Sequence, residues 1–220
     1  LEPKDAMVYT EFNPRDFESI WRPFQPEGNL VFRELPAEIQ VTMLGEIIKQ
    51  VNEWMGRNIL QGDTGGSAPD NIFDGLITKA VADGDVIDIA TPAALTKSNV
   101  ISKINLVYEA IPFAVRNNPN LKLFTSVATW DLYEQAVIET ANKGGFYDTS
   151  VPKRFKGKQL VPLAGMPDDT IFASVGTADR GSNLWVGTDV ENDSEVIQVE
   201  KLEAKSELFF FKMLFKMDTQ

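Results

Sequence analysis

Apolar residues recur every four positions between residues 35 and 60, a spacing typical of an amphipathic helix. Pro36 suits the first turn of such a helix. At 1.5 Å per residue, about 24 residues would span roughly 36 Å, which is long for a chain of this size. The pattern therefore predicts a structural spine helix, with this stripe: Leu35, Ile39, Met43, Ile47, Val51 and Met55.

The closing stretch "ELFFFKMLFKMDTQ" is unusually apolar, but its period is two. Lys212 and Lys216 interrupt it, whereas a membrane span needs about 20 largely apolar residues. The pattern predicts a strand with one buried face and one mixed face, and no membrane anchor. The predicted buried face holds Phe209, Phe211, Met213, Phe215 and Met217.

The segments between these two elements predict helices first and strands later. A helix is expected over 91–111, with Thr91 as N-cap and Pro92 as its first residue. A strand at 121–128 leads into a helix at 129–142, and the pattern is β-like from Phe155 onward. This order predicts an α+β fold with mostly antiparallel sheets.

Residues 8–32 combine aromatic side chains with three prolines, which forbid a continuous helix or a central strand. Two interpretations remain open. The segment packs on its own domain, or it is an extended arm whose aromatic side chains dock on another subunit. The candidate interface residues of such an arm are Phe12, Phe17, Trp21, Phe24 and Phe32.

Composition narrows the possible chemistry. The 220 residues carry a net charge of −11, which argues against a free-standing nucleic-acid binder. Cysteine and histidine are absent, so thiolate nucleophiles, the commonest metal ligands and the commonest proton carrier are all missing. We therefore expect no catalytic residue, no cofactor and no bound metal.

Three short motifs suggest sites. "GDTGGS" at 62–67 resembles the nucleophile region of chymotrypsin-like proteases, but those enzymes need a histidine base. "DGDVID" at 83–88 has Ile87 and Asp88 where a calcium loop needs an oxygen ligand and a glycine. A solvated acidic turn is therefore the better interpretation. "PKRFKGK" at 152–158 is either a solvated loop entering a strand or a basic contact loop. Its basic residues are Lys153, Arg154, Lys156 and Lys158.

The order of these parts resembles the major capsid proteins of tailed bacteriophages, whose fold is named for phage Hong Kong ninety-seven. Three stretches carry the resemblance: "FDGL" (73–76), "FKGKQLVPLAGMPDDTIFAS" (155–174) and "NLWVGTD" (183–189). The resemblance rests on order and spacing over about residues 8–220. It implies an extended loop or arm at 1–34 and a peripheral domain with the spine helix at 35–84. It further implies an axial domain at 85–188 and C-terminal strands at 189–220 that return to the peripheral domain.

The same resemblance implies a structural, non-enzymatic role. The chain would assemble with itself into hexamer and pentamer rings and an icosahedral shell that encloses DNA, which it would contact only indirectly. Scaffolding, portal and decoration proteins would be its further partners. It would be found in the virion capsid, and in the bacterial cytoplasm before assembly. Two alternatives stay open: a carboxylate-based metal-dependent hydrolase and a monomeric binding module.

Overall fold

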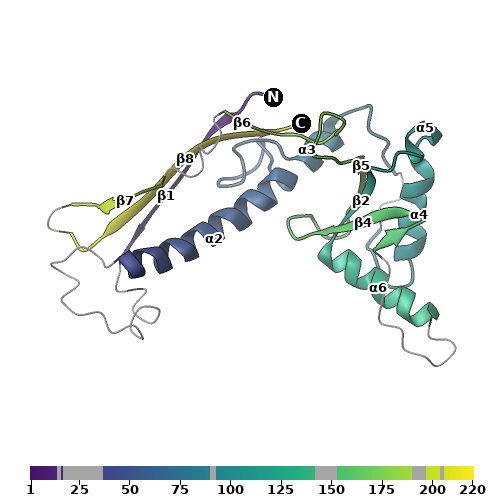
Figure 1. Cartoon of the computed structure of the whole chain (residues 1–220), viewed down its shortest axis with the longest axis horizontal. Helices are drawn as coiled ribbons and strands as arrows, with labels where there is room; N and C mark the ends of the chain where they lie inside the picture. Colours follow the sequence, from purple (N-terminus) through teal and green to yellow (C-terminus); the bar gives the residue numbers. More distant parts are fainter. Residues whose placement is uncertain (14–15, 17–36, 90–92, 142–152, 190–196, 204–205) are drawn as a thin grey trace. The chain divides into compact units, whose positions relative to one another are not determined.

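The chain divides into two compact units (Figure 1). Unit 1 comprises Leu1–Met55 and Gly187–Asp218, and unit 2 comprises Gly56–Val186 with Thr219–Gln220. The computed structural model describes residues 1–13, 16, 37–89, 93–141, 153–189, 197–203 and 206–220. Of the predicted arm residues, Phe17, Trp21, Phe24 and Phe32 lie outside the described residues.

Unit 1 is built around the closing strand β8 (Phe209–Thr219). β8 pairs antiparallel with β1 (Lys4–Phe12), and also pairs with β6 (Val186–Thr188) and β7 (Ile197–Lys201). Along β8, the side chains of Phe211, Met213, Phe215 and Met217 are buried, whereas Leu214 on the opposite face is exposed. The predicted strand with one buried and one mixed face is therefore confirmed.

The spine helix α2 (Ala37–Gln61) has 25 residues and supplies the rest of this core. Ile47 and Val51, two members of the predicted stripe, are buried. Trp54 meets Phe215 of β8 edge-on, with 6.3 Å between ring centroids. The spine helix and the closing strand thus share one core, and the predicted helix is confirmed.

Unit 2 contains a second four-stranded sheet, in the order β3 (Arg154–Phe155), β4 (Lys158–Leu163), β2 (Leu121–Ser126), β5 (Ile171–Val175). β2 and β4 are parallel, and α6 (Val127–Ala141) lies between them in sequence, as a parallel crossover requires. The other pairings in this sheet are antiparallel. The main hydrophobic cluster of unit 2 consists of Val100, Ile104, Ile111, Leu121, Leu123, Trp130, Tyr133, Ala136, Leu160 and Val175.

The helix predicted over 91–111 is wrong in its first half. The structure has α4 (Val100–Ala110), followed by the short α5 (Phe113–Arg116), while residues 93–99 are loop and turn. Asn99 explains the difference, because its side-chain oxygen accepts a hydrogen bond from Thr96 N at 2.8 Å and its amide donates to Ala94 O at 3.0 Å. Such local side-chain bonds compete with helix formation. The predicted cap Thr91 lies outside the described residues.

The "GDTGGS" segment begins a loop between α2 and α3 that hydrogen bonds hold at its base and to α2. Gly75 N donates to Gly62 O at 2.8 Å, closing the loop at its base. Asp70 accepts from Arg57 at 3.0 Å and from Asn58 at 2.8 Å, both on α2. The loop leads into α3 (Leu76–Ala82). Gly62 allows close packing at the base of the loop, because a Cβ atom there would lie 2.4 Å from Phe73 O and 2.8 Å from Asn58 O.

Candidate interaction surfaces

Among the predicted arm residues, Phe12 is the one that the structure describes. It ends β1, where it stacks on Phe209 of β8 with 6.2 Å between centroids and 22° between ring planes. Phe12 and Phe209 are partners in the strand register. Phe12 therefore has an aromatic partner in its own chain, and β1 is a strand that the proline-rich pattern of 8–32 concealed.

The predicted basic contact loop is the hairpin β3–β4. Its two turn residues, Lys156 and Gly157, have positive φ angles of 46° and 83°, as a tight two-residue hairpin turn requires. The turn is held by Lys156 Nζ, which donates to Asn105 Oδ1 at 2.5 Å and lies 5.1 Å from the centre of the Tyr108 ring. The hairpin is therefore fixed against α4.

The four basic residues of this hairpin differ in their contacts. Lys156 also lies 3.8 Å from Glu109, and Lys158 Nζ donates to Asn118 O at 2.9 Å. Lys153 and Arg154 are exposed, and within the described residues they form no ion pair. The structure thus leaves two of the four predicted cations available to a partner.

A second exposed feature of unit 2 is Phe113 at the start of α5, whose side chain is 82% exposed. The Arg116 guanidinium carbon lies 4.4 Å from the centre of its ring. Arg116 is itself fixed, because Nη2 donates to Glu109 O and to Ile111 O, both at 2.8 Å. An aromatic side chain held in the open by a neighbouring cation is a typical contact residue. Sequence reasoning missed it, because an isolated Phe after Pro112 gives no signal.

The outer face of the unit 1 sheet is partly apolar. Met7 and Leu214 are opposite each other in the register and are 58% and 50% exposed. Charged residues surround them. Lys216 lies 3.2 Å from Asp189 and 3.7 Å from Asp5, and its hydrogen bond to Asp189 holds the pKa of Lys216 above its ordinary value. On the same face, a hydrogen bond to Glu11 raises the pKa of Tyr9.

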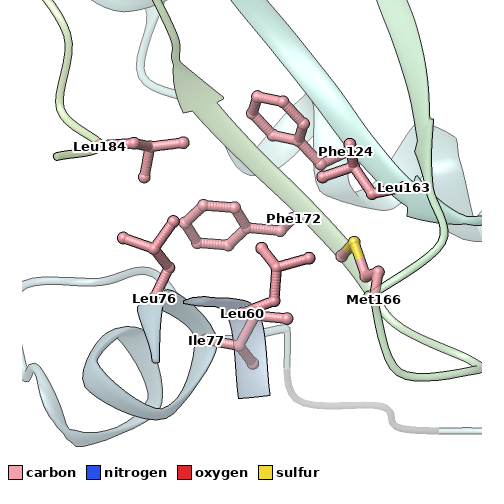
Figure 2. A pocket seen from close by; sticks show the side chains of 8 residues that line it. All are labelled: Leu60, Leu76, Ile77, Phe124, Leu163, Met166, Phe172 and Leu184. Carbon is pink, nitrogen blue, oxygen red and sulfur yellow. The ribbon is translucent and has the colours of Figure 1, made fainter. Parts of the chain in front are cut away.

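Unit 2 encloses a small apolar cavity of about 70 Å³ (Figure 2). Its wall lacks polar groups, and its volume is well below the ~300 Å³ at which ligand pockets begin. Apolar cavities of this kind stay dry. It is therefore a packing gap between α2, α3 and the sheet, lined by Leu60, Leu76, Ile77, Phe124, Leu163, Met166, Phe172 and Leu184.

The acidic side chains of the ordered loops serve as hydrogen-bond acceptors. Asp74 Oδ1 accepts from Thr64 N and Oγ1 at 2.7 and 2.8 Å. Over the part of the chain that the structure describes, no three acidic side chains converge as metal ligands would. In the same residues, no helix is long and apolar enough to cross a bilayer.

Comparison by sequence gives no relative: neither a protein-family model nor any curated protein matches the chain. Comparison of structures does. A chain of the satellite phage P4 procapsid that includes the size determination (Sid) protein matches with a TM-score of 0.61 and 11% identity, over 100% of this chain and 72% of that one. A chain from the capsid of the native GTA particle matches with a TM-score of 0.59 and 11% identity, over 99% and 68%.

A chain from the capsid of the empty GTA particle matches at a TM-score of 0.56 and 13% identity, over 99% of this chain and 69% of that one. Likenesses of this extent establish the fold. The chain has the α+β fold found in these phage and GTA capsids, which confirms the fold predicted from the order of its elements.

Proposed function

We propose that this chain is the major shell-forming subunit of a tailed phage, a prophage or a related particle. The observation that carries the proposal is the structural likeness to capsid chains over the entire length of this chain, at a TM-score of 0.61. Since one fold can host several functions, the surfaces must also suit the role. Unit 2 presents a fixed exposed aromatic at Phe113, and cations at Lys153 and Arg154 that have no ion pair within the described residues. Its cavity is too small for a substrate.

In this proposal the subunits form rings that close into an icosahedral shell around DNA, and the protein is located in the virion. The role is structural and not enzymatic, with no cofactor. Residues 1–34 would be an extended loop, 35–84 and 189–220 a peripheral domain, and 85–188 an axial domain. Scaffolding, portal and decoration proteins would be further partners.

Self-assembly is the direct test of the proposal. The purified chain, concentrated in steps, should form rings or closed shells visible by negative-stain electron microscopy, with a matching fast fraction in sedimentation velocity. The reason is that heterologous contacts between copies close into rings and shells. A chain that stays monomeric at every concentration and salt would support the binding-module alternative instead.

The arm residues Phe17, Trp21 and Phe24 are the proposed assembly contacts outside the described residues. Deleting residues 1–30 would not test them cleanly, because β1 pairs with β8 along its full length from Lys4 to Phe12. Replacing the three aromatic residues by serine leaves that strand intact. This triple variant should remain folded by circular dichroism and lose assembly.

The matched control retains apolar character at the same positions: Phe17→Leu, Trp21→Phe and Phe24→Leu. It should assemble nearly as well as the parent, because hydrophobic burial depends mainly on apolar area. Normal particles from the serine variant would show that the arm is not an assembly contact.

A further inference from the structure

The end of α3 and the turn that follows it expose apolar and acidic side chains together. All residues from Val81 to Asp88 are exposed, with Val81 at 84% and Ile87 at 55%. The turn is well formed, since Val86 N donates to Asp83 O at 3.2 Å and Asp85 N donates to Asp83 Oδ1 at 2.9 Å. We call residues 81–88 the acidic turn.

The carboxylates of the acidic turn are not neutralised by a cation of the described chain. Within those residues, Asp83, Asp85 and Asp88 form no ion pair. The basic residue nearest in sequence, Lys79, donates instead to the backbone oxygen of Thr219. Large apolar side chains among unpaired like charges are typical of a surface that a partner covers.

The complementary surface lies on the same unit of the chain. Lys153 and Arg154 precede and begin β3, are exposed, and lack an ion-pair partner in the described residues. The hairpin that carries them is fixed through Lys156, so the two cations are presented by a rigid element. Phe155, which follows Arg154 in β3, packs inward on the core, with its ring centroid 6.3 Å from that of Tyr108 and 6.4 Å from that of Tyr133. The strand that begins with Arg154 is thereby held in place.

The acidic turn and the basic hairpin do not neutralise each other's charges within the described part of one chain. Across the described ranges, no hydrogen bond or ion pair joins the acidic turn to the basic hairpin. We propose that the acidic turn of one copy docks on the basic hairpin of the next copy. The proposal rests on the proposed function, in that it requires the chain to self-assemble. A contact of this kind is heterologous, so each copy offers one surface and receives the other, as ring closure requires.

Charge reversal tests the proposal. Asp85→Lys places a cation opposite the basic hairpin, and Arg154→Glu places a carboxylate opposite the acidic turn. Like charges in contact across an interface are strongly unfavourable, so each variant should raise the concentration needed for half-maximal assembly at least about tenfold. Raising the salt from about 0.05 M to 0.5 M should shrink this difference, because the Debye length falls.

A mixture of the two variants distinguishes contact between chains from contact within a chain. In an alternating assembly, the cation introduced by Asp85→Lys would face the carboxylate introduced by Arg154→Glu. The remaining contacts would join the unchanged Asp85 of one variant to the unchanged Arg154 of the other. The equimolar mixture should therefore assemble at nearly the parent's threshold although neither variant does so alone. Controls are Asp131→Lys and Arg180→Glu, which change the net charge equally at exposed positions elsewhere in unit 2.

The outcomes separate this inference from the proposed function. If the parent assembles and both charge variants assemble like it, the docking inference is wrong while the proposed function stands. If the charge variants fail and their mixture is no better, the two surfaces do not meet between copies. If the parent itself never assembles, both proposals fall. Circular dichroism of each variant confirms that lost assembly is not lost folding.

Discussion

Phe211 is the most completely buried large side chain of β8. It is 0% exposed and lies between Thr10 of β1 and Val199 of β7 in the strand register. The Phe211 ring is therefore fully removed from water. Its neighbour Leu214, on the other face of the same strand, is 50% exposed.

Phe211→Ala should lower the free energy of unfolding of unit 1 by about 3–5 kcal/mol, because a buried ring is lost and a cavity remains. That is a large share of a typical net stability of about 5–15 kcal/mol. Leu214→Ala, the matched control, should cost only about 0.5 kcal/mol. Urea unfolding followed by tryptophan fluorescence measures both, and equal midpoints would contradict the observed burial.

Gly75 is required for a different reason, namely close backbone approach. A Cβ atom there would lie 2.5 Å from the carbonyl carbon of Leu60 and 2.7 Å from Asn58 O, both backbone atoms that cannot rotate away. Gly75→Ala should therefore destabilise unit 2 by about 1–3 kcal/mol. Gly84→Ala is the control, since its Cβ would meet nothing within 4 Å. Thermal unfolding should separate the two variants clearly.

Asp179 should make one loop of unit 2 sensitive to acid. The Thr177 hydroxyl donates to Asp179 Oδ1 at 2.6 Å and Gly181 N donates to it at 2.9 Å. These bonds favour the carboxylate and hold the pKa of Asp179 below its ordinary value of about 4. A lowered folded-state pKa contributes stability that is present above the unfolded value and is lost as pH falls through the folded value.

Thr177→Val removes the hydroxyl while keeping the side-chain shape, so the pKa of Asp179 should rise toward its ordinary value. Carboxyl-detected NMR titration reports this shift directly. Thr170→Val is the control, because the Thr170 hydroxyl donates to the backbone oxygen of Asp168 and to no carboxylate. An unchanged pKa in Thr177→Val would mean that the hydroxyl does not stabilise the charged form.

At the scale of elements, the sequence predicted those helices and strands in which buried apolar residues repeat over many positions. α2 and β8 could be predicted because Ile47 and Val51, or Phe211 and Phe215, repeat at the period of their element. β1 was not predicted, because the three prolines further along residues 8–32 argue against a central strand in that segment. The start of α4 was misplaced because Asn99 makes specific bonds that an apolar stripe does not reveal.

The candidate surfaces could be predicted only in part. The cluster of basic residues at 152–158 is visible in the sequence, but the use of Lys156 and Lys158 inside the chain depends on Asn105 and Asn118, which are distant in sequence. Likewise, the exposure of Phe113 follows from the corner between α4 and α5. Contacts between segments that are distant in sequence decide which charged side chains stay free to bind a partner. The residues around each charge do not indicate these contacts.

Substitution of Gly45 tests whether α2 needs a flexible residue within the helix. A Cβ atom there would meet nothing within 4 Å, and glycine in a helix interior costs roughly 0.5–1 kcal/mol relative to alanine. Gly45→Ala should therefore raise the stability of unit 1 by about that amount. Gly45→Pro should lower it by about 3 kcal/mol or more. If Gly45→Ala is destabilising in urea unfolding, the space around Gly45 is not open in solution.

At the scale of the whole molecule, the two units differ in how far apart in sequence their contacting residues lie. The main hydrophobic cluster of unit 2 lies within residues 100–175. Unit 1 instead depends on pairing across the chain, with Lys4 opposite Met217 at one end of the register. The main cluster of unit 2 is thus formed by one stretch of the chain, whereas the sheet of unit 1 joins segments that are far apart in sequence.

A fragment of residues 56–186 should therefore fold alone, with the near-ultraviolet circular dichroism of packed Trp130 and Tyr133. It should be less stable than the parent, because it lacks the hydrogen bonds of Thr219 to Asp74 O and of Gln220 N to Trp185 O. A fragment of residues 1–55, which lacks β8, should show little strand structure. A disordered 56–186 fragment would mean that unit 2 needs Thr219–Gln220 or residues of unit 1 to fold.

The central place of β8 in its sheet also sets an order of events during translation. β1 leaves the ribosome before β8, and residues 56–186 of unit 2 are made between them. The apolar faces of β1 and of α2 in nascent unit 1 therefore stay uncovered until β8 is made. Unit 2 can fold during that interval. A binding surface on the β8 sheet cannot form before β8 has been made. Chains that end before β8 would therefore be excluded from any assembly that uses this surface.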